Sequence, residues 1–283
     1  MRPLPANPDK KRGEKGWALV TGASAGIGLE LARAFASRGY DLIVSARSEK
    51  AIANLAREVI ATYAVGARPL TADLSLPGAA EAIADAIARA RIDVEVLINN
   101  AGVLFEGDFV DIPLESHLRL LEINIVAATS LTRLFLPAML ERRRGRILNV
   151  ASTASFAPVP RLAVYAAAKA YILSLTESLA EELGGTGVTA TALCPGITDT
   201  AMTRGSSLAK PVPAMIVMSA KEVAAAGCAA CLKGETICVP GFVNKVVAGG
   251  APLLPRRLVR GIGGFMNRGG LERIANALKP RRG

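Results

Sequence analysis

The stretch Thr21-Gly22-Ala23-Ser24-Ala25-Gly26-Ile27-Gly28 follows the apolar run Trp17-Ala18-Leu19-Val20 and opens a helical pattern that continues to Ser37. Its glycines allow a sharp backbone turn and a close approach to a bound group. The N-terminus of the following helix offers free N–H groups and a partial positive charge, which attract a pyrophosphate. Glycine in such a turn can also serve packing alone, so the rest of the chain has to support the phosphate-binding interpretation.

Short apolar runs and longer helical stretches alternate through the remaining sequence. We predict further strands at 41–45, 67–72, 94–98, 145–150, 187–193 and 236–239, and helices at 48–62, 77–90, 115–140, 163–183 and 220–232. Apolar residues make up 51% of the chain and aromatic residues only 4%, which suits a sheet buried between helices. The pattern predicts an α/β fold: a Rossmann-type doubly wound parallel sheet of about seven strands with helices on both faces.

The chain of 283 residues divides by composition into three parts. We predict a basic N-terminal tail at 1–15, one domain at 16–240 and a basic C-terminal extension at 241–283. Within the domain, residues 201–219 hold two prolines and three methionines without clear periodicity, which is typical of a substrate lid. Within the extension, Leu254–Phe265 has the pattern of a short basic amphipathic helix, weakened by glycines.

The net charge of +10 belongs to the two ends of the chain. Residues 1–15 carry +3 and residues 245–283 carry +8, which leaves residues 16–244 at −1. Charged termini of this kind are usually solvated tails. The more specific alternative is peripheral contact of the C-terminal tail with an anionic membrane surface. No nucleic-acid motif accompanies the charge, so we expect no nucleic-acid partner. No apolar run approaches the roughly 20 residues of a membrane span, and the N-terminus lacks a signal-peptide pattern, so a cytoplasmic location is expected.

The cysteines and the single histidine predict no metal site. Cys228 and Cys231 form a C-x-x-C pair in helical sequence, but neither a second such pair nor more than one histidine, His117, is present. Buried reduced thiols are the expected state. The single histidine, His117, lies far from any Ser-His-Asp pattern, so hydrolase chemistry has no support.

Further motifs follow the glycine-rich turn in a fixed order, and together they resemble the short-chain dehydrogenase/reductase family in its single-domain form. The resemblance covers about residues 16–240. Its motifs are T-G-x-x-x-G-I-G at 21–28, Asp73-Leu74, Asn99-Asn100-Ala101-Gly102, Asn124, Ser152, Tyr165-x-x-x-Lys169 and Pro195-Gly196. The resemblance implies that Asp73 contacts adenine and that Asn124 holds a water linking Lys169 to solvent. Residues 220–240 and the basic tail resemble a branch of this family whose members have a C-terminal extension past the last strand.

The Tyr–Lys pair has a physical rationale of its own. Tyr165 and Lys169 are spaced i and i+4, so on a helix they share a face. A phenol with a pKa of about 10 is a poor acid or base at neutral pH. A nearby ammonium, together with an oxidised nicotinamide, lowers that pKa. Ser152, at a strand end, is suited to hydrogen-bond a substrate oxygen as charge develops there.

The predicted site therefore has two groups of residues. The catalytic group is Asn124, Ser152, Tyr165 and Lys169. The cofactor-binding group is Gly22, Ser24, Gly26, Ile27, Gly28, Arg47, Asp73, Leu74, Asn100, Ala101, Gly102, Tyr165, Lys169, Pro195, Gly196, Thr198 and Thr200. Taken singly, each catalytic residue has a plainer interpretation: an exposed tyrosine, a solvated lysine, a helix-capping serine and a buried amide.

The end of the second strand favours NADP(H) as cofactor. NAD-specific folds place a carboxylate there, whereas NADP-specific folds place a basic side chain for the 2′-phosphate. Ser45-Ala46-Arg47-Ser48 contains no acid, and Arg47 can pair with a phosphate. Many NADP-using relatives carry a second basic residue where this chain has Ala25.

We therefore expect an NADP(H)-dependent oxidoreductase acting on a carbonyl or secondary alcohol. The alternative is a catalytically silent NADP(H)-binding sensor or scaffold protein; an epimerase or dehydratase of nucleotide sugars is disfavoured by length and glycine spacing. The apolar lid and apolar residues near the site favour a lipophilic carbonyl substrate; these residues are Val103, Ala154, Phe156, Val159 and Met202. The resemblance implies a homodimer or homotetramer.

Overall fold

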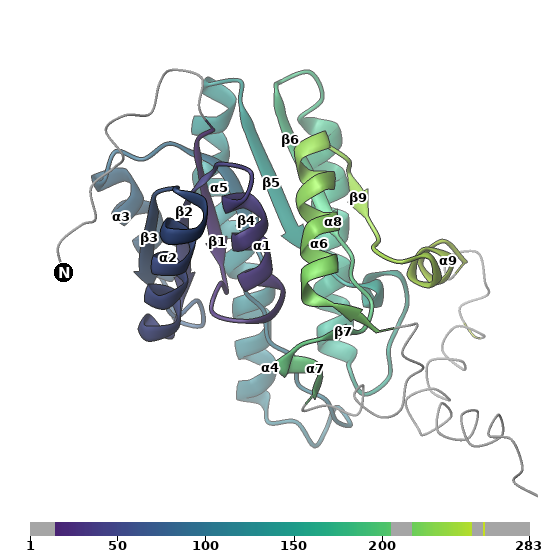
Figure 1. Ribbon diagram of the computed structural model, residues 1–283. Helices are drawn as coiled ribbons and strands as arrows, with labels where there is room; N and C mark the ends of the chain where they lie inside the picture. The colour runs from purple at the N-terminus through teal and green to yellow at the C-terminus, as the bar shows by residue number, and fades with distance from the viewer. Residues whose placement is uncertain (1–14, 205–216, 251–256, 258–283) are drawn as a thin grey trace, which may run out of the picture.

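Strands and helices alternate along the chain in the computed structural model, which describes residues 15–204, 217–250 and 257 (Figure 1). The strands are β1 (Trp17–Thr21), β2 (Asp41–Ala46), β3 (Ala67–Thr71), β4 (Val94–Asn99), β5 (Gly145–Val150), β6 (Val188–Leu193), β7 (Thr198–Asp199), β8 (Met218–Ser219) and β9 (Ile237–Cys238). The α-helices are α1 (Gly26–Ala36), α2 (Glu49–Tyr63), α3 (Ala79–Arg89), α4 (Leu114–Leu121), α5 (Ala127–Glu141), α6 (Ala163–Glu182), α7 (Ala201–Arg204), α8 (Ala220–Lys233) and α9 (Phe242–Gly250).

Seven strands form one parallel sheet in the order β3-β2-β1-β4-β5-β6-β9, and β7 and β8 form a separate parallel pair. The chain leaves β1 toward β2 and β3 on one side and continues from β4 to β9 on the other. This reversal of strand order opens a crevice at the carboxyl ends of β1 and β4, where ligands bind in open α/β sheets. The predicted fold class and strand number are confirmed.

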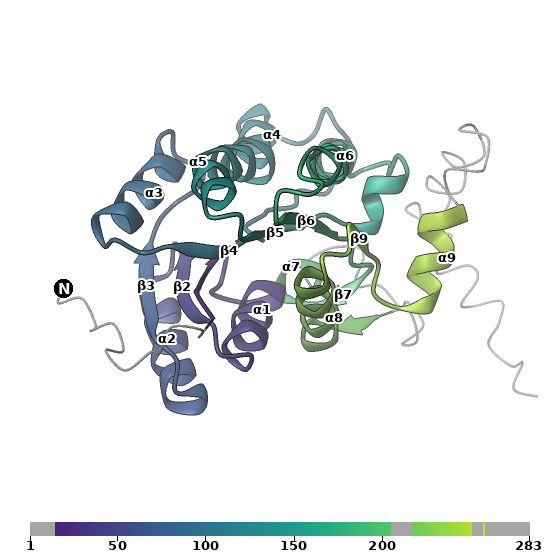
Figure 2. The same ribbon diagram turned by 90° about the horizontal axis from the view of Figure 1, so that it is seen from above.

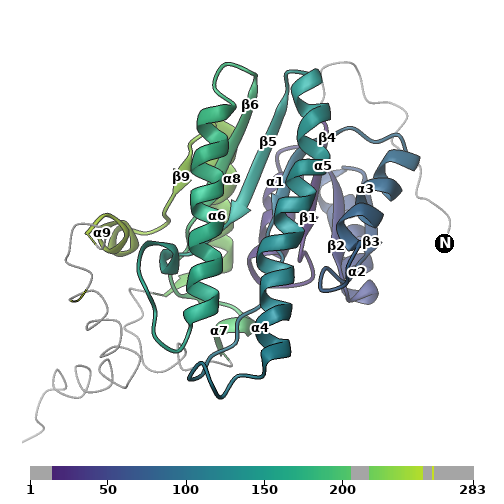
Figure 3. The same ribbon diagram turned by 180° about the vertical axis from the view of Figure 1, so that it is seen from behind.

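Helices cover both faces of the sheet (Figures 2 and 3). On one face Val20 packs with Leu31 and Phe35 of α1, and on the opposite face Leu19 packs with Leu131 of α5. Adjacent residues of β1 are therefore both fully buried. This explains why the strands appear in the sequence as continuous apolar runs rather than as an alternating pattern.

The predicted helix 115–140 is a continuous helix, Leu114–Glu141, with a π-helical turn, η1 (Glu122–Val126), between α4 and α5. Among the described residues it is the one helix long and apolar enough to cross a membrane by length and composition, with 39% of its most apolar window buried. This corrects the expectation that no segment approaches that length. Leu120, Leu131 and Met139 are buried, and a helix that covers a sheet passes the same test.

The structure departs from the sequence expectations most clearly near the C-terminus. The ninth strand has two residues instead of the predicted 236–239, and α9 occupies a region for which no element was predicted. Residues 242–247 are apolar except for Asn244 and Lys245, and this run is too short to show a helical period. The predicted N-terminal tail up to residue 14, residues 205–216 of the predicted lid and the predicted helix at 254–265, apart from Arg257, lie outside the described residues.

Candidate active site

The turn between β1 and α1 is held against the end of β4 by Asn100. Its Nδ2 donates to the carbonyl oxygens of Thr21 (2.8 Å) and Gly22 (3.2 Å), and the Oγ1 of Thr21 accepts from the backbone N–H of Asn100 and Ala101. Gly22 has φ +65°, and a Cβ on Gly28 would collide with Asn100 Nδ2 and the Gly22 carbonyl oxygen. Only glycine therefore fits at position 28, because the protein's own groups leave no room for a side chain, and the approach to a pyrophosphate stays a prediction.

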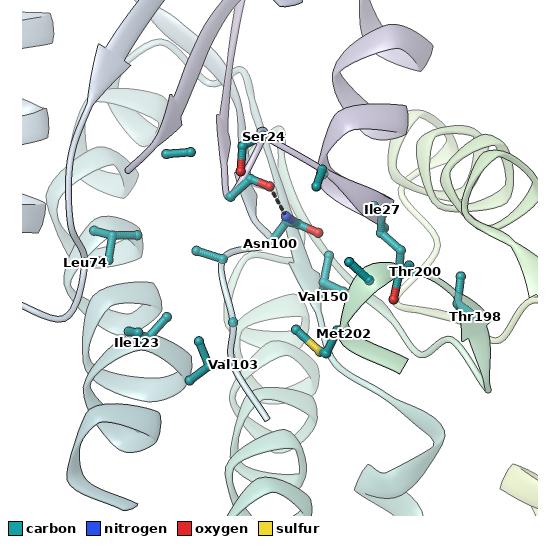
Figure 4. Close-up of a pocket in the computed structure, with 18 of the residues that line it drawn as sticks. Ser24, Ile27, Leu74, Asn100, Val103, Ile123, Val150, Thr198, Thr200 and Met202 are labelled. Carbon is teal, nitrogen blue, oxygen red and sulfur yellow. Dashed lines mark hydrogen bonds between the residues drawn. The ribbon is translucent and has the colours of Figure 1, made fainter. Parts of the chain in front are cut away.

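A cleft of about 620 Å³ lies at the carboxyl ends of the central strands (Figure 4). All the predicted cofactor-binding residues line it, although they come from six separate stretches of sequence; they are Gly22, Ser24, Gly26, Ile27, Gly28, Arg47, Asp73, Leu74, Asn100, Ala101, Gly102, Tyr165, Lys169, Pro195, Gly196, Thr198 and Thr200. Ser152 lines the same cleft. The predicted catalytic and cofactor-binding residues thus share one cavity, except Asn124, which is buried behind it.

The end of the cleft formed by β2 and β3 is charged. Arg47 follows β2 and is exposed, and Asp73 follows β3. Burial opposes ionisation of Asp73, but hydrogen bonds from the Ser75 backbone N–H (3.0 Å) and Oγ (2.7 Å), with the charges of Arg47 and Arg119, hold its pKa below the usual value. Arg119 on α4 was not predicted, because nothing in its local sequence marks it.

Lys169 is buried, with 5% of its surface exposed, and its Nζ donates a 2.7 Å hydrogen bond to the carbonyl oxygen of Val150. Burial lowers the pKa of Lys169 from 10.5 to about 8, because an ammonium loses hydration inside the protein. Its backbone carbonyl accepts from Ser155 Oγ at 2.8 Å, which ties α6 to the short 3₁₀-helix η2 (Thr153–Phe156) after β5.

Tyr165 and Ser152 line the same cleft as Lys169. The Nζ of Lys169 is 5.7 Å from the centroid of the Tyr165 ring. Burial raises the pKa of Tyr165, and a hydrogen bond with Ser152 offsets this only in part. The protein groups alone thus raise the pKa of Tyr165, and its lowering by Lys169 together with an oxidised nicotinamide stays a prediction. Ser152 also caps η2, since its Oγ accepts from the Ala154 N–H at 3.1 Å, so the capping interpretation is correct as well.

Asn124 lies in the π-helical turn η1 and is 2% exposed. Its amide pairs with the backbone of Val103, accepting from the N–H at 2.9 Å and donating to the carbonyl at 3.1 Å. The position that a Cβ on Gly102 would occupy is 3.3 Å from Asn124 Oδ1 and 3.6 Å from Lys169 Nζ. Asn124 and Lys169 therefore approach the same point of the backbone, and the π-helical turn places Asn124 there.

The apolar lining differs in part from the prediction. Val103 and Met202 line the cleft, but Ala154, Phe156 and Val159 do not. Ile123 and Val150 also line it and were not predicted (Figure 4). Ile123 precedes Asn124 on the same turn, so the motif around Asn124 was the available signal. The four cysteines are free, and among the described residues no cluster of three His, Cys, Asp or Glu side chains is arranged to hold a metal.

The parallel sheet, the glycine turn against β4 and the cleft at the strand ends define a dinucleotide-binding protein of the Rossmann class. A family model described as short chain dehydrogenase matches residues 16–210. The chain belongs to the short-chain dehydrogenase/reductase family of oxidoreductases, as the sequence motifs predicted.

Known proteins similar to the chain agree with this membership. A very-long-chain 3-oxoacyl-CoA reductase of Anas platyrhynchos is 34% identical over 72% of this chain and 67% of its own length. A solved short-chain dehydrogenase from Sphingobium yanoikuyae in complex with NADPH has a TM-score of 0.76 and 28% identity, over 95% of this chain and 98% of its own. A bulky-bulky ketone specific alcohol dehydrogenase from Comamonas testosteroni has a TM-score of 0.73 and 28% identity, over 85% and 94%. Structure neighbours solved with NADPH or NADP support a nicotinamide cofactor for this chain.

Proposed function

We propose that the chain is an NADP(H)-dependent oxidoreductase that interconverts a carbonyl compound and its alcohol, with Tyr165 as the acid/base. The observation that carries the proposal is that Ser152, Tyr165 and Lys169 line the same cleft as the glycine turn. A protein that only binds a nucleotide has no need of a phenol beside a buried ammonium. The sensor or scaffold alternative finds no supporting observation.

The cleft fits a dinucleotide phosphate. The close backbone approach at Gly22 and Gly28 suits the pyrophosphate, and the lining residues Asp73, Leu74 and Ile123 suit the adenine end. Ser45, Ala46, Arg47 and Ser48 line the cleft after β2 without a carboxylate, and the exposed Arg47 guanidinium is suited to pair with a 2′-phosphate. These features support NADP(H) over NAD(H).

The side chains divide the chemistry among them. When bound, the nicotinamide supplies or accepts the hydride. Ser152 is suited to donate a hydrogen bond to the substrate oxygen, where negative charge develops. Because burial raises the pKa of Tyr165, the phenol is protonated at neutral pH and suited to give its proton to that oxygen during reduction. Lys169, with a pKa of about 8, is suited to restore the proton, and Asn124 approaches the same point of the backbone at Gly102.

We propose a lipophilic carbonyl compound as the substrate. Val103, Ile123 and Met202 give the cleft apolar walls (Figure 4). The names of two similar proteins point the same way, since one is a very-long-chain 3-oxoacyl-CoA reductase and the other is specific for bulky-bulky ketones. Turnover confined to small charged keto acids would contradict this part of the proposal.

We further propose a homodimer or homotetramer located in the cytoplasm, with residues 16–240 as the catalytic domain between a basic tail and a basic extension. The exposed side chains of Leu118, Val126 and Leu134 along the helix Leu114–Glu141 support self-association, because they leave apolar surface in water. Sedimentation at several protein concentrations tests the assembly.

The first experiment is a titration of the purified full chain with NADPH and with NADH, followed by a screen of aldehydes, ketones, steroids and quinones by nicotinamide absorbance. Tighter binding of NADPH than NADH, with turnover of at least one carbonyl class, is the expected result. Binding of neither nucleotide would overturn the proposal. Tight NADPH binding without turnover of any class would favour the sensor alternative.

A further inference from the structure

Helix α9 presents an apolar face to solvent next to the candidate active site. Phe242, Val243, Val246 and Val247 are 81, 38, 58 and 53% exposed. Positions i, i+1, i+4 and i+5 share one side of a helix, so the four side chains form a continuous strip, which we call the α9 face. Lys245 is exposed and projects from the rim of this face. An exposed apolar strip with a charged rim marks a surface that contacts something other than water.

The opposite side of α9 is held to the domain, so the α9 face has a defined orientation. Asn244 and Ala248 are 7 and 5% exposed. The Nδ2 of Asn244 donates a 2.8 Å hydrogen bond to the carbonyl oxygen of Pro240, and its amide lies against Gly196, which lines the cleft. The helix also packs against η2, directly after Ser152. In the ribbon view α9 lies at the β9 edge of the sheet, farthest from β3 (Figure 2).

The sequence from α9 to the C-terminus is strongly basic. The helix holds no acidic residue, and the sequence from Lys245 to the C-terminus contains nine basic residues and one acidic residue. Residues 16–244 carry −1, so the positive charge of the domain and its extension begins at this helix. Apolar insertion flanked by lysine and arginine is the combination that holds a helix in the plane of an anionic bilayer surface.

We infer that α9 docks the protein on an anionic lipid surface, with the α9 face in the headgroup region and the exposed Lys245 at its rim against the lipid charge. A second copy of the chain is a poorer occupant, because a stable protein interface needs roughly 800 Å² and 20–30 residues from each partner. Four side chains on a helix of nine residues fall far short of that. A bilayer needs no complementary shape, so a small apolar strip with added charge is sufficient.

Docking by α9 would bring the cleft to the membrane surface, which suits delivery of a lipophilic carbonyl substrate. This benefit rests on the proposed function, but the docking itself does not. Lipid binding is measured without turnover, so failure of the docking inference and failure of the oxidoreductase proposal are distinguishable.

The test is flotation of the full chain with vesicles of phosphatidylcholine alone or mixed with phosphatidylglycerol, at low and high salt. The variant Phe242→Ser/Val246→Ser removes half of the α9 face without changing charge. The matched control is Leu76→Ser, which removes an apolar side chain that is 59% exposed just before α3; α3 and α9 lie on opposite sides of the molecule (Figure 1). A Phe242→Trp variant reports insertion, because its emission shifts to the blue when the ring leaves water.

We expect binding to the anionic vesicles that weakens with salt, a loss of about tenfold or more in the α9 variant, and no loss in the control. Phe242→Trp should shift its emission only with the anionic vesicles. Four results would overturn the inference: no vesicle binding by the full chain, equal binding by the α9 variant, binding without a shift in emission, or a change of oligomeric state in the α9 variant. The second and third would assign lipid binding to the basic tail alone; the fourth would assign the α9 face to a second copy.

Discussion

The Nζ of Lys169 lies 5.7 Å from the centroid of the Tyr165 ring, one helical turn along α6. The ammonium donates its hydrogen bond to the carbonyl oxygen of Val150, at the end of β5. Lys169 thus connects the helix that carries the acid/base to the strand that leads to Ser152. Tyr165 and Lys169 lie on α6 and Asn124 lies in the π-helical turn η1, whereas Ser152 lies between β5 and η2.

Lys169 should make stability depend on alkaline pH. Its pKa is about 8 in the folded chain against an ordinary 10.5, so between these values the unfolded chain binds a proton that the native state has released. Below pH 8 the buried ammonium lowers the free energy of unfolding, and this cost disappears as the pH rises toward 10.5. Lys169→Met should remove this pH dependence. Denaturant unfolding at pH 7.5 to 10 should show wild type gaining about 1–3 kcal/mol relative to the variant. If the free energies of unfolding of wild type and variant change equally with pH, Lys169 is solvated.

Arg47→Asp should weaken NADPH binding far more than NADH binding. The substitution removes the cation at the cleft end after β2 and places a carboxylate where the 2′-phosphate is expected. The dissociation constant for NADH divided by that for NADPH should fall by about tenfold or more. The control is Arg57→Asp on α2, an exposed arginine whose hydrogen bond goes to Asn54 and which does not line the cleft. An unchanged ratio in Arg47→Asp would mean that the phosphate is recognised by other residues.

Gly28→Ala should abolish dinucleotide binding and lower stability. The added Cβ would collide with Asn100 Nδ2 and the Gly22 carbonyl oxygen, so the turn or the Asn100 hydrogen bonds must shift. A loss of about 2 kcal/mol or more in the free energy of unfolding is expected. Gly249→Ala is the control, because nothing lies within 4 Å of the position of its added Cβ. Normal NADPH binding by Gly28→Ala would show that cofactor binding does not require the close approach of Gly28 to Gly22 and Asn100.

Most of the fold could be predicted from the sequence because a doubly wound sheet has strong local signals. Leu19 and Val20 are buried on opposite faces, so β1 had to be a short apolar run, and the same holds for its neighbours. The helix α9 escaped prediction for a physical reason. Its apolar residues face solvent and its buried side carries Asn244 and Ala248, so the usual relation between an apolar stripe and the core is reversed.

The candidate site was predictable where backbone geometry demands one residue type. Gly22 and Gly28 are required by the turn, and the Tyr165–Lys169 spacing follows from the helix. Ile123, which lines the cleft, and Arg119, whose charge acts on Asp73, were missed because their positions come from the course of the helix Leu114–Glu141 over the sheet. Burial, which raises the pKa of Tyr165, could not be predicted, since spacing reveals a neighbouring charge but not the extent of burial.

The central claim, that Tyr165 is the acid/base of an NADP(H)-dependent reaction, is tested most directly by comparing wild type with Tyr165→Phe. Both proteins are titrated with NADPH and then assayed for reduction of the best carbonyl substrate at saturating NADPH. The substitution removes only the phenolic hydroxyl, so NADPH affinity should change by less than about threefold while kcat falls by about a thousandfold or more. A Tyr165→Phe rate near that of wild type would contradict the assignment.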